Sequence, residues 1–502
     1  MNSGSLILLI ISVFSVIETA YSWKFFHHGR VIDKSHKLGS FENEKPSKYE
    51  RWITQNLDHF HPTNERTWQQ RYYVNDEFFN STSRNVAFLM IGGEGEATAE
   101  WMEEGSWIDW GKEFRAICFQ LEHRYYGKSH PTGDLSTGNL EFLNSHQALA
   151  DLAFFIEAMN VKHELSPDIK WIVFGGSYPG SLAAWLRQKY PHLVHGAVST
   201  SGPLLAKLNF DEYYRVVADD LRLYSDECLE AVQEGSAQAE VLLKHPLGQK
   251  NLDKVLNLCD PIADNVNNTD DIANLFTNLA GNFAGISQYN KDNRKSNRKH
   301  NVTLDTLCDI MVNQTIGPQI NRLAAVNSLI LNISNQTCLD YKYDKMIQEM
   351  KNISWDSESS EGGRQWTYQT CTEFGFYQTS DYKPQIFGDK FPLDFSVQQC
   401  VDIFGPEFDM KFQQKAVDDT NVAYGALDIE VTNVLFVHGS VDPWHALGIT
   451  KTLNNYAPAI FIEGTAHCAD MYPARDSDLP QLKAARVQIQ QQISSWLDWN
   501  LY

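Results

Sequence analysis

Short apolar runs alternate with segments of helical periodicity between residues 86 and 200, and this alternation constrains the fold more than any other feature of the chain. Apolar runs of four to eight residues bounded by glycines indicate strands, whereas apolar residues spaced three and four apart indicate helices. The expected strands are VAFLMI (86–91), AICFQL (116–121) and WIVF (171–174), and GAVSTSG (196–202) closes the block. The expected helices are 145–160, with Ser145 as its cap, and 181–190. This order predicts the α/β class, a mostly parallel sheet with helices on both faces.

The same pattern returns at the end of the chain. The expected elements are a strand at 433–439, a helix at 447–456, a strand at 459–464 and a terminal amphipathic helix at 486–500. Between roughly 205 and 425 the alternation is lost and the sequence favours helices. That stretch is therefore interpreted as an insertion into the α/β core.

The length of 502 residues exceeds what one hydrophobic core usually holds, so we expect two structural units. The predicted divisions are a signal peptide (1–22), the first part of the core (23–204), an inserted helical cap (205–425) and the second part of the core (426–502). A basic run in the cap, YNKDNRKSNRKHN (289–301), favours a solvated loop, with a binding patch as the alternative.

The stretch FGGSYPG (174–180) supplies the candidate nucleophile, Ser177. A strand, a glycine turn, a serine and a helix form the setting of a nucleophile elbow. Pro179 stands where the G-x-S-x-G pattern has its last glycine, and Gly180 follows one residue later. Proline is tolerated in the first turn of a helix, because its missing N–H has no partner there. The competing interpretation is a phosphate loop, but no lysine follows these glycines.

A serine hydroxyl needs a base, and the base needs a carboxylate that orients it. In this architecture the carboxylate and the histidine follow the serine in that order, each after a strand. FVHGSVDPWHA supplies Asp442 and IEGTAHCADM supplies His467. His438 and His445 are rival bases, but each lies within four residues of Asp442 and is poorly placed to bridge to another loop. We assign Ser177 as nucleophile, His467 as general base and then acid, and Asp442 as its orienting carboxylate.

The oxyanion hole is expected to use two backbone N–H groups. One is that of Tyr178, the residue after the nucleophile, and the other comes from GGEGEA (92–97), around Gly93 and Glu94. The alternative interpretation of these glycines is a plain turn.

The N-terminus predicts entry into the secretory pathway. LILLIISVFSVI (6–17) is too short to span a bilayer and typical of a signal peptide, with Ala20 and Ser22 forming a cleavage site. The alternative is an uncleaved anchor. No later stretch is long and apolar enough to span, so we expect a secreted or lysosomal protein without stable membrane insertion after cleavage.

Glycosylation signals and cysteines agree with that route. Asn-x-Ser/Thr acceptors are Asn80, Asn267, Asn301, Asn313, Asn332, Asn335 and Asn352. The six between 267 and 352 indicate a solvated, glycosylated surface. The eight cysteines include no C-x-x-C pair, which favours disulfides over a zinc site, so no metal or cofactor is expected. The net charge of −21 excludes a nucleic-acid partner, and dimerisation stays open.

Five motifs in order resemble one known family. LEHRYYGKS, FGGSYPG, YQTCTEFGFYQT, HGSVDPWHALG and GTAHCADM resemble peptidase family S28, the serine carboxypeptidases, nearest its thymus-specific serine protease branch. The resemblance spans about residues 50 to 500 and implies an α/β-hydrolase core with a helical cap between serine and aspartate. It implies a triad at Ser177, Asp442 and His467, and peptidase activity on peptides, in better-known members after proline near a chain end and at acidic pH.

The resemblance also implies substrate-pocket and disulfide residues. Trp444 matches a tryptophan of the family's proline pocket, with a plain core aromatic as the alternative, and Glu96 stands where aminodipeptidase members hold an aspartate for the substrate's amino end. The implied disulfides are Cys228–Cys308, Cys259–Cys338 and Cys371–Cys400. Cys118 and Cys468 are left over, as free thiols or as a bridge between themselves.

Three functions follow, in descending order. The first is a serine exopeptidase that works through an acyl-enzyme and cuts after proline in the manner of the family. The second is a lipase or esterase on the same fold, and the third is a non-catalytic glycosylated binding protein.

Overall fold

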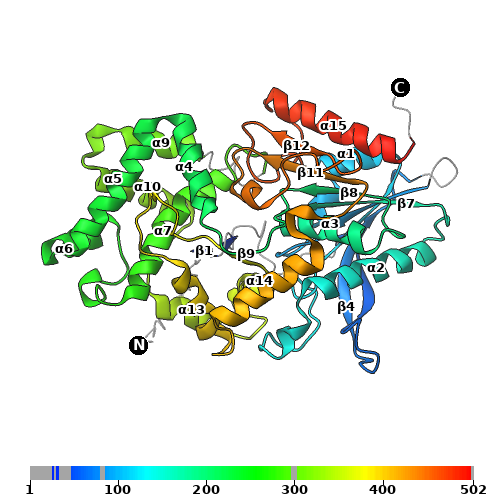
Figure 1. Cartoon of the computed structure of the whole chain (residues 1–502), viewed down its shortest axis with the longest axis horizontal. Helices are drawn as coiled ribbons and strands as arrows, with labels where there is room; N and C mark the ends of the chain where they lie inside the picture. The colour runs from blue at the N-terminus through cyan, green and yellow to red at the C-terminus, as the bar shows by residue number, and fades with distance from the viewer. Residues whose placement is uncertain (1–24, 28–29, 33–46, 80–84, 295–301, 499–502) are drawn as a thin grey trace, which may run out of the picture.

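The computed structural model describes residues 25–27, 30–32, 47–79, 85–294 and 302–498 (Figure 1). The predicted signal peptide (1–22), Asn80 and Asn301 lie outside the described residues. The five other glycosylation acceptors are all exposed: Asn267, Asn313, Asn332, Asn335 and Asn352. No helix in the described residues is both long and apolar enough to cross a membrane.

An eight-stranded sheet forms the centre of the core, in the order β12-β11-β8-β7-β5-β6-β4-β3. The strands from β12 to β6 are parallel to one another, whereas β4 pairs antiparallel with β6 and β3 pairs antiparallel with β4. Their bounds are Glu50–Asn56 (β3), Thr67–Asn75 (β4), Val86–Ile91 (β5), Ile117–Leu121 (β6), Lys170–Gly176 (β7), Gly196–Thr200 (β8), Val434–Gly439 (β11) and Ala459–Ile462 (β12). The predicted fold class is therefore confirmed.

Helices cover both faces of this sheet (Figure 1). They are α1 (Ser106–Glu113), α2 (Ser145–Lys162), α3 (Tyr178–Lys189) and α15 (Pro480–Trp496). Along β5, Phe88 packs on the α1 and α15 side, whereas Leu89 packs on the α2 and α3 side. Because successive strand residues point to opposite faces, a strand covered twice must be apolar throughout, which is why VAFLMI shows no polar alternation.

The stretch between β8 and β11 is mainly helical and lies beside the core (Figure 1). Its helices are α4 (Glu212–Tyr224), α5 (Asp226–Leu243), α6 (Pro246–Val255), α7 (Thr269–Gln288), α9 (Leu304–Val312), α10 (Gln319–Ile333), α11 (Tyr343–Met350), α12 (Gly363–Gln369), α13 (Leu393–Phe404) and α14 (Met410–Tyr424). Two small two-stranded sheets are β1 (Phe25–His27) with β2 (Arg30–Ile32), and β9 (Lys207–Asn209) with β10 (Gly375–Tyr377). The apolar core of this stretch is continuous with that under α2 and α3. The proposed domain boundaries stay a prediction.

Short helical turns complete the chain. They are the 3-10 helices η2 (Ala99–Met102), η3 (Asn139–Phe142), η4 (Ile262–Asp264), η5 (Gln314–Ile316), η6 (Ser359–Glu361), η8 (Ala426–Asp428) and η9 (Pro443–Leu447), and one π-helical turn, η7 (Thr370–Phe374).

Three disulfides lie in the helical stretch between β8 and β11. They are Cys228–Cys308, Cys259–Cys338 and Cys371–Cys400, the pairs that the family resemblance implies. Cys118 and Cys468 are free and buried.

Two local predictions are wrong. No helix forms over 447–456, because Thr452 Oγ1 accepts the Ala459 N–H and the Asn454 side chain accepts the Tyr456 N–H, so these side chains hold the backbone in turns. The cap of α2 is Asn144, whose side chain accepts the Gln147 N–H, rather than Ser145.

Candidate active site

Ser177 occupies a sharp turn between β7 and α3. Its backbone angles, φ 66° and ψ −136°, lie in a region that residues other than glycine rarely adopt. A Cβ added to Gly175 would lie 2.0 Å from the Pro179 carbonyl oxygen, and one added to Gly180 would lie 2.4 Å from that of Thr200. Glycine is therefore required at both positions, because a neighbouring carbonyl oxygen occupies the place of a Cβ. Pro179 lies in the first turn of α3, where proline is tolerated.

Asp442 and His467 form a buried pair that brings two loops together. Asp442 follows β11 as the N-cap of η9, and its Oδ1 accepts hydrogen bonds from the Trp444 N–H at 3.0 Å and from His467 Nδ1 at 2.8 Å. Burial alone would raise the pKa of Asp442, but the His467 charge holds that pKa below its usual value. Burial would lower the pKa of His467, but Asp442 holds it well above the ordinary value. The pair fixes the imidazole with Nε2 facing away from the carboxylate.

Neither rival histidine is hydrogen-bonded to the Asp442 carboxylate. His445 Nδ1 lies 2.7 Å from the main-chain oxygen of Asp442, and neither ring nitrogen of His438 forms a hydrogen bond with any of the described residues. A Cβ on Gly448 would lie 2.0 Å from the His438 ring, which is packed inside the loop. Burial lowers the pKa of His438 to about 4, so its ring is neutral at ordinary pH.

Ser177 and His467 line one cavity of about 950 Å³. His467 Nε2 is buried and makes no hydrogen bond within the described chain. No hydrogen bond joins it to Ser177 in this structure. Such contacts are often long in unliganded enzymes and tighten when substrate binds. The geometry thus joins Asp442 to His467 directly and brings Ser177 to the same cavity.

The loop that follows β5 lies against the elbow. A Cβ on Gly93 would lie 2.4 Å from Pro179 Cγ, so glycine is required for this contact. Gly93 and Glu94 line the cavity beside Ser177, whereas the Tyr178 side chain is buried below it. The candidate oxyanion donors therefore converge on the N-terminus of α3, where the helix favours negative charge.

A buried arginine, Arg71, supports the loop that follows β5, a feature that the sequence did not reveal. Arg71 donates to Glu122 at 2.5 Å and to Glu96 at 2.9 Å, and Glu122 also accepts the Ala97 N–H at 3.0 Å. Glu96 lines the cavity with 24% of its side chain exposed. Its carboxylate is therefore paired with Arg71 in this structure.

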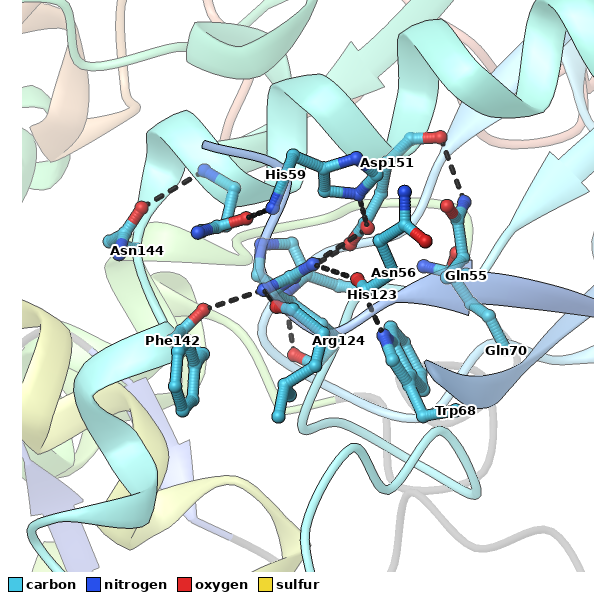
Figure 2. A network of polar contacts seen from close by, with 12 residues as sticks. Gln55, Asn56, His59, Trp68, Gln70, His123, Arg124, Phe142, Asn144 and Asp151 are labelled. Atoms are coloured by element: carbon cyan, nitrogen blue, oxygen red, sulfur yellow. Dashed lines mark hydrogen bonds and ion pairs between the residues drawn. The ribbon is translucent and has the colours of Figure 1, made fainter. Parts of the chain in front are cut away.

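The LEHRYY segment forms a second buried network, shown in Figure 2. Arg124 donates to both oxygens of Asp151 at 2.7 Å, and His59 Nε2 lies 2.7 Å from Asp151 Oδ1. The adjacent His123 lies 3.1 Å from the Tyr178 hydroxyl. These contacts fix the loop that follows β6 and, through His123, the side chain of Tyr178, which follows Ser177.

Trp444 lies in an aromatic cluster, not in the cavity lining. Its side chain is 3% exposed, its indole N–H donates to Gln288, and its ring packs against Phe210 and Phe376. The ring centroid is 6.4 Å from that of His467. The described residues contain no group of three or more histidine, cysteine, aspartate or glutamate side chains that is arranged to hold a metal.

The sequence of this chain matches a known family. The sequence model of the family Serine carboxypeptidase S28 matches residues 55–489. The chain belongs to this family. The elbow at Ser177, the Asp442–His467 pair and the LEHRYY network all lie within the matched S28 region.

Named S28 relatives align over most of their length. The thymus-specific serine protease of Mus musculus is 36% identical, over 89% of this chain and 87% of its own. The corresponding protein of Homo sapiens is 34% identical, over 89% and 86%. Lysosomal Pro-X carboxypeptidase of Bos taurus is 27% identical, over 89% and 87%. The chain is accordingly a serine-type peptidase.

Proposed function

We propose that this protein is a secreted or lysosomal exopeptidase in which Ser177 is the nucleophile, His467 the general base and acid, and Asp442 the orienting carboxylate. The observation that carries the proposal is the Asp442–His467 pair, whose unpartnered Nε2 belongs to the same cavity as Ser177. The strained turn at Ser177 supports it independently, because a side chain is held there at a conformational cost.

The reaction proceeds through an acyl-enzyme. Ser177 Oγ attacks the scissile carbonyl carbon while its proton passes to His467 Nε2. That proton passes to the leaving amine as the C–N bond breaks. Water then attacks the ester by the same route and restores the free serine and a carboxylic acid product. The oxyanion receives hydrogen bonds from the Tyr178 N–H and from the Gly93–Glu94 loop.

Cleavage after proline extends the proposal. It is supported by the similarity to the relatives named lysosomal Pro-X carboxypeptidase. The N-terminal apolar run and the exposed glycosylation acceptors support passage through the secretory pathway. The cap boundaries at 205 and 425 are part of the same proposal, because the helices and disulfides fall between them.

The test is labelling with a fluorophosphonate probe, comparing the native protein with Ser177→Ala and His467→Ala, followed by peptides that have proline or alanine before the scissile bond. We expect labelling that both variants abolish, and turnover of the prolyl peptides. Ester turnover without peptide turnover would favour a lipase or esterase. Absence of Ser177-dependent labelling in folded protein would leave only the non-catalytic binding function.

A further inference from the structure

The first part of the basic run is not a solvated loop. Asp292 and Asn293 are buried, and Asn293 donates to the Pro473 carbonyl oxygen at 2.9 Å and to Asp478 at 2.7 Å. Arg475 in turn donates to the Asn293 carbonyl oxygen at 2.6 Å. These contacts tie the segment after α7 to the loop that follows His467. Tyr289 and Arg294, at the two ends of the described part of the run, line the cavity, whereas residues 295–301 lie outside the described residues.

Arg294 is held rigidly in that wall. Its Nε donates to Asp292 Oδ2 at 2.7 Å, and its guanidinium carbon lies 3.6 Å from the centre of the Tyr289 ring. Its side chain is 17% exposed and lines the cavity that Ser177 and His467 share. Within the described residues the two terminal nitrogens of Arg294 donate no hydrogen bond. A guanidinium held at Nε and open at its outer edge is arranged to receive a carboxylate through two parallel N–H groups.

Arg294 is linked to His467 through the ring of Tyr289. The Tyr289 ring, which carries the guanidinium, meets the His467 ring edge-on with centroids 5.9 Å apart. His467 must protonate the leaving amine, so the residue beyond the scissile bond lies beside the imidazole. In a terminal residue the α-carboxylate is only two bonds from that amine. A carboxylate so close to the amine needs a partner near the imidazole, and Arg294 lines the same cavity as His467.

We propose that Arg294 binds the α-carboxylate of the leaving residue and makes this protein a carboxypeptidase that removes one C-terminal residue. This proposal rests on the function proposed above and adds the end of the peptide at which it acts. The opposite specificity would place the substrate's ammonium on an acidic side chain of the loop after β5, and Glu94 and Glu96 both line the cavity. Glu96, the residue matched to that role, is bonded to Arg71, whereas Arg294 is bonded to Asp292 through Nε alone and its two terminal nitrogens donate no hydrogen bond within the described residues.

The experiment compares three amino-blocked substrates: prolyl-phenylalanine with a free carboxylate, its C-terminal amide, and the amide of prolyl-glutamate. The enzymes are the native protein, Arg294→Gln, Arg294→Lys and Lys291→Gln. The last is the matched control, because Lys291 is in the same run, is exposed, pairs with Asp305 and does not line the cavity. Fluorophosphonate labelling of every variant reports whether Ser177 and His467 remain competent.

We expect the native protein to prefer the free acid over its amide by about 10- to 100-fold in kcat/KM, the range of a hydrogen bond to a charged group. Arg294→Gln should remove that preference by lowering kcat/KM for the free acid, mainly through a higher KM. Arg294→Lys should retain part of it, and Lys291→Gln all of it. Labelling should be unchanged throughout.

Other outcomes overturn the proposal. Equal cleavage of acid and amide by the native protein, or an undiminished preference in Arg294→Gln, would show that Arg294 does not bind the terminal carboxylate. A preference for the prolyl-glutamate amide over the phenylalanine amide would assign Arg294 to an acidic side chain instead. Cleavage only of peptides with a free amino end would show aminopeptidase action. Loss of labelling in the native protein would instead refute the proposed function.

Discussion

Replacing Ser177 with glycine should stabilise the protein more than replacing it with alanine, although both changes abolish catalysis. At φ 66° and ψ −136° any side chain with a Cβ is strained, and glycine is not. Alanine and glycine both remove the hydroxyl, so the difference between the two variants reports the backbone alone.

The magnitude follows from two opposed terms. Relief of strain at such a residue amounts to about 1–3 kcal/mol. Glycine also gains freedom in the unfolded chain, which lowers stability by about 0.4–1 kcal/mol. The net advantage of glycine over alanine is therefore between zero and about 2.6 kcal/mol. For a chain of 502 residues the entropy of unfolding is about 1 kcal/mol per kelvin, so glycine is expected to raise Tm above that of the alanine variant by up to about 2.5 °C.

Scanning calorimetry with the disulfides intact measures this difference. Ser181 provides the control, because it is buried in α3 and its hydroxyl donates to Pro203. Ser181→Ala and Ser181→Gly lose the same hydrogen bond, but glycine in a helix should be the less stable by about 1 kcal/mol. If the glycine variant is more stable than the alanine variant at Ser177 but less stable at Ser181, the result supports a strained backbone at the nucleophile. If glycine is less stable than alanine at both positions, the reasoning is refuted.

Three further predictions concern the pair at His467 and the disulfides. Asp442→Asn should lower kcat by about 10⁴-fold because the imidazole loses its orienting carboxylate, and labelling at an unchanged rate would contradict this. Since Asp442 raises the pKa of His467 and the base must be neutral, kcat/KM should rise with pH through the pKa of His467 and level off above it, and a kcat/KM that does not change with pH would contradict this. Cys228→Ala with Cys308→Ala should lower stability by about 2–5 kcal/mol, because the bridge closes a long loop, and an unchanged denaturant midpoint would show that the bridge is dispensable.

The sheet and the elbow could be predicted because their signals are local. Strands buried on both faces must be apolar along their whole length, and Gly175 is required by its contact with Pro179, only a few residues along the chain. The order of Ser177, Asp442 and His467 then followed from the architecture, since equivalent loops emerge at one edge of a parallel sheet.

The errors and omissions arose where individual side-chain contacts, which neither apolar spacing nor charge reveals, decide the structure. The helix expected at 447–456 has the right apolar spacing, but Thr452 and Asn454 bind the local backbone instead. Arg71 pairs with Glu122 across the sheet, and no spacing rule connects them. Arg294 belongs to a run whose charge favours a solvated loop, and only its contacts with Tyr289 and Asp292 make it part of the cavity.

The pairing of β8 with β11 sets an order of events during synthesis. Ala197 lies beside Val434 in the sheet, so the whole helical stretch is made before β8 acquires this neighbour. Until then β8 is an exposed edge with apolar residues, a site for unwanted strand pairing. A chain released early carries the serine but neither Asp442 nor His467. With the proposed triad, peptidase activity would therefore be withheld until Asp442 and His467 have been made.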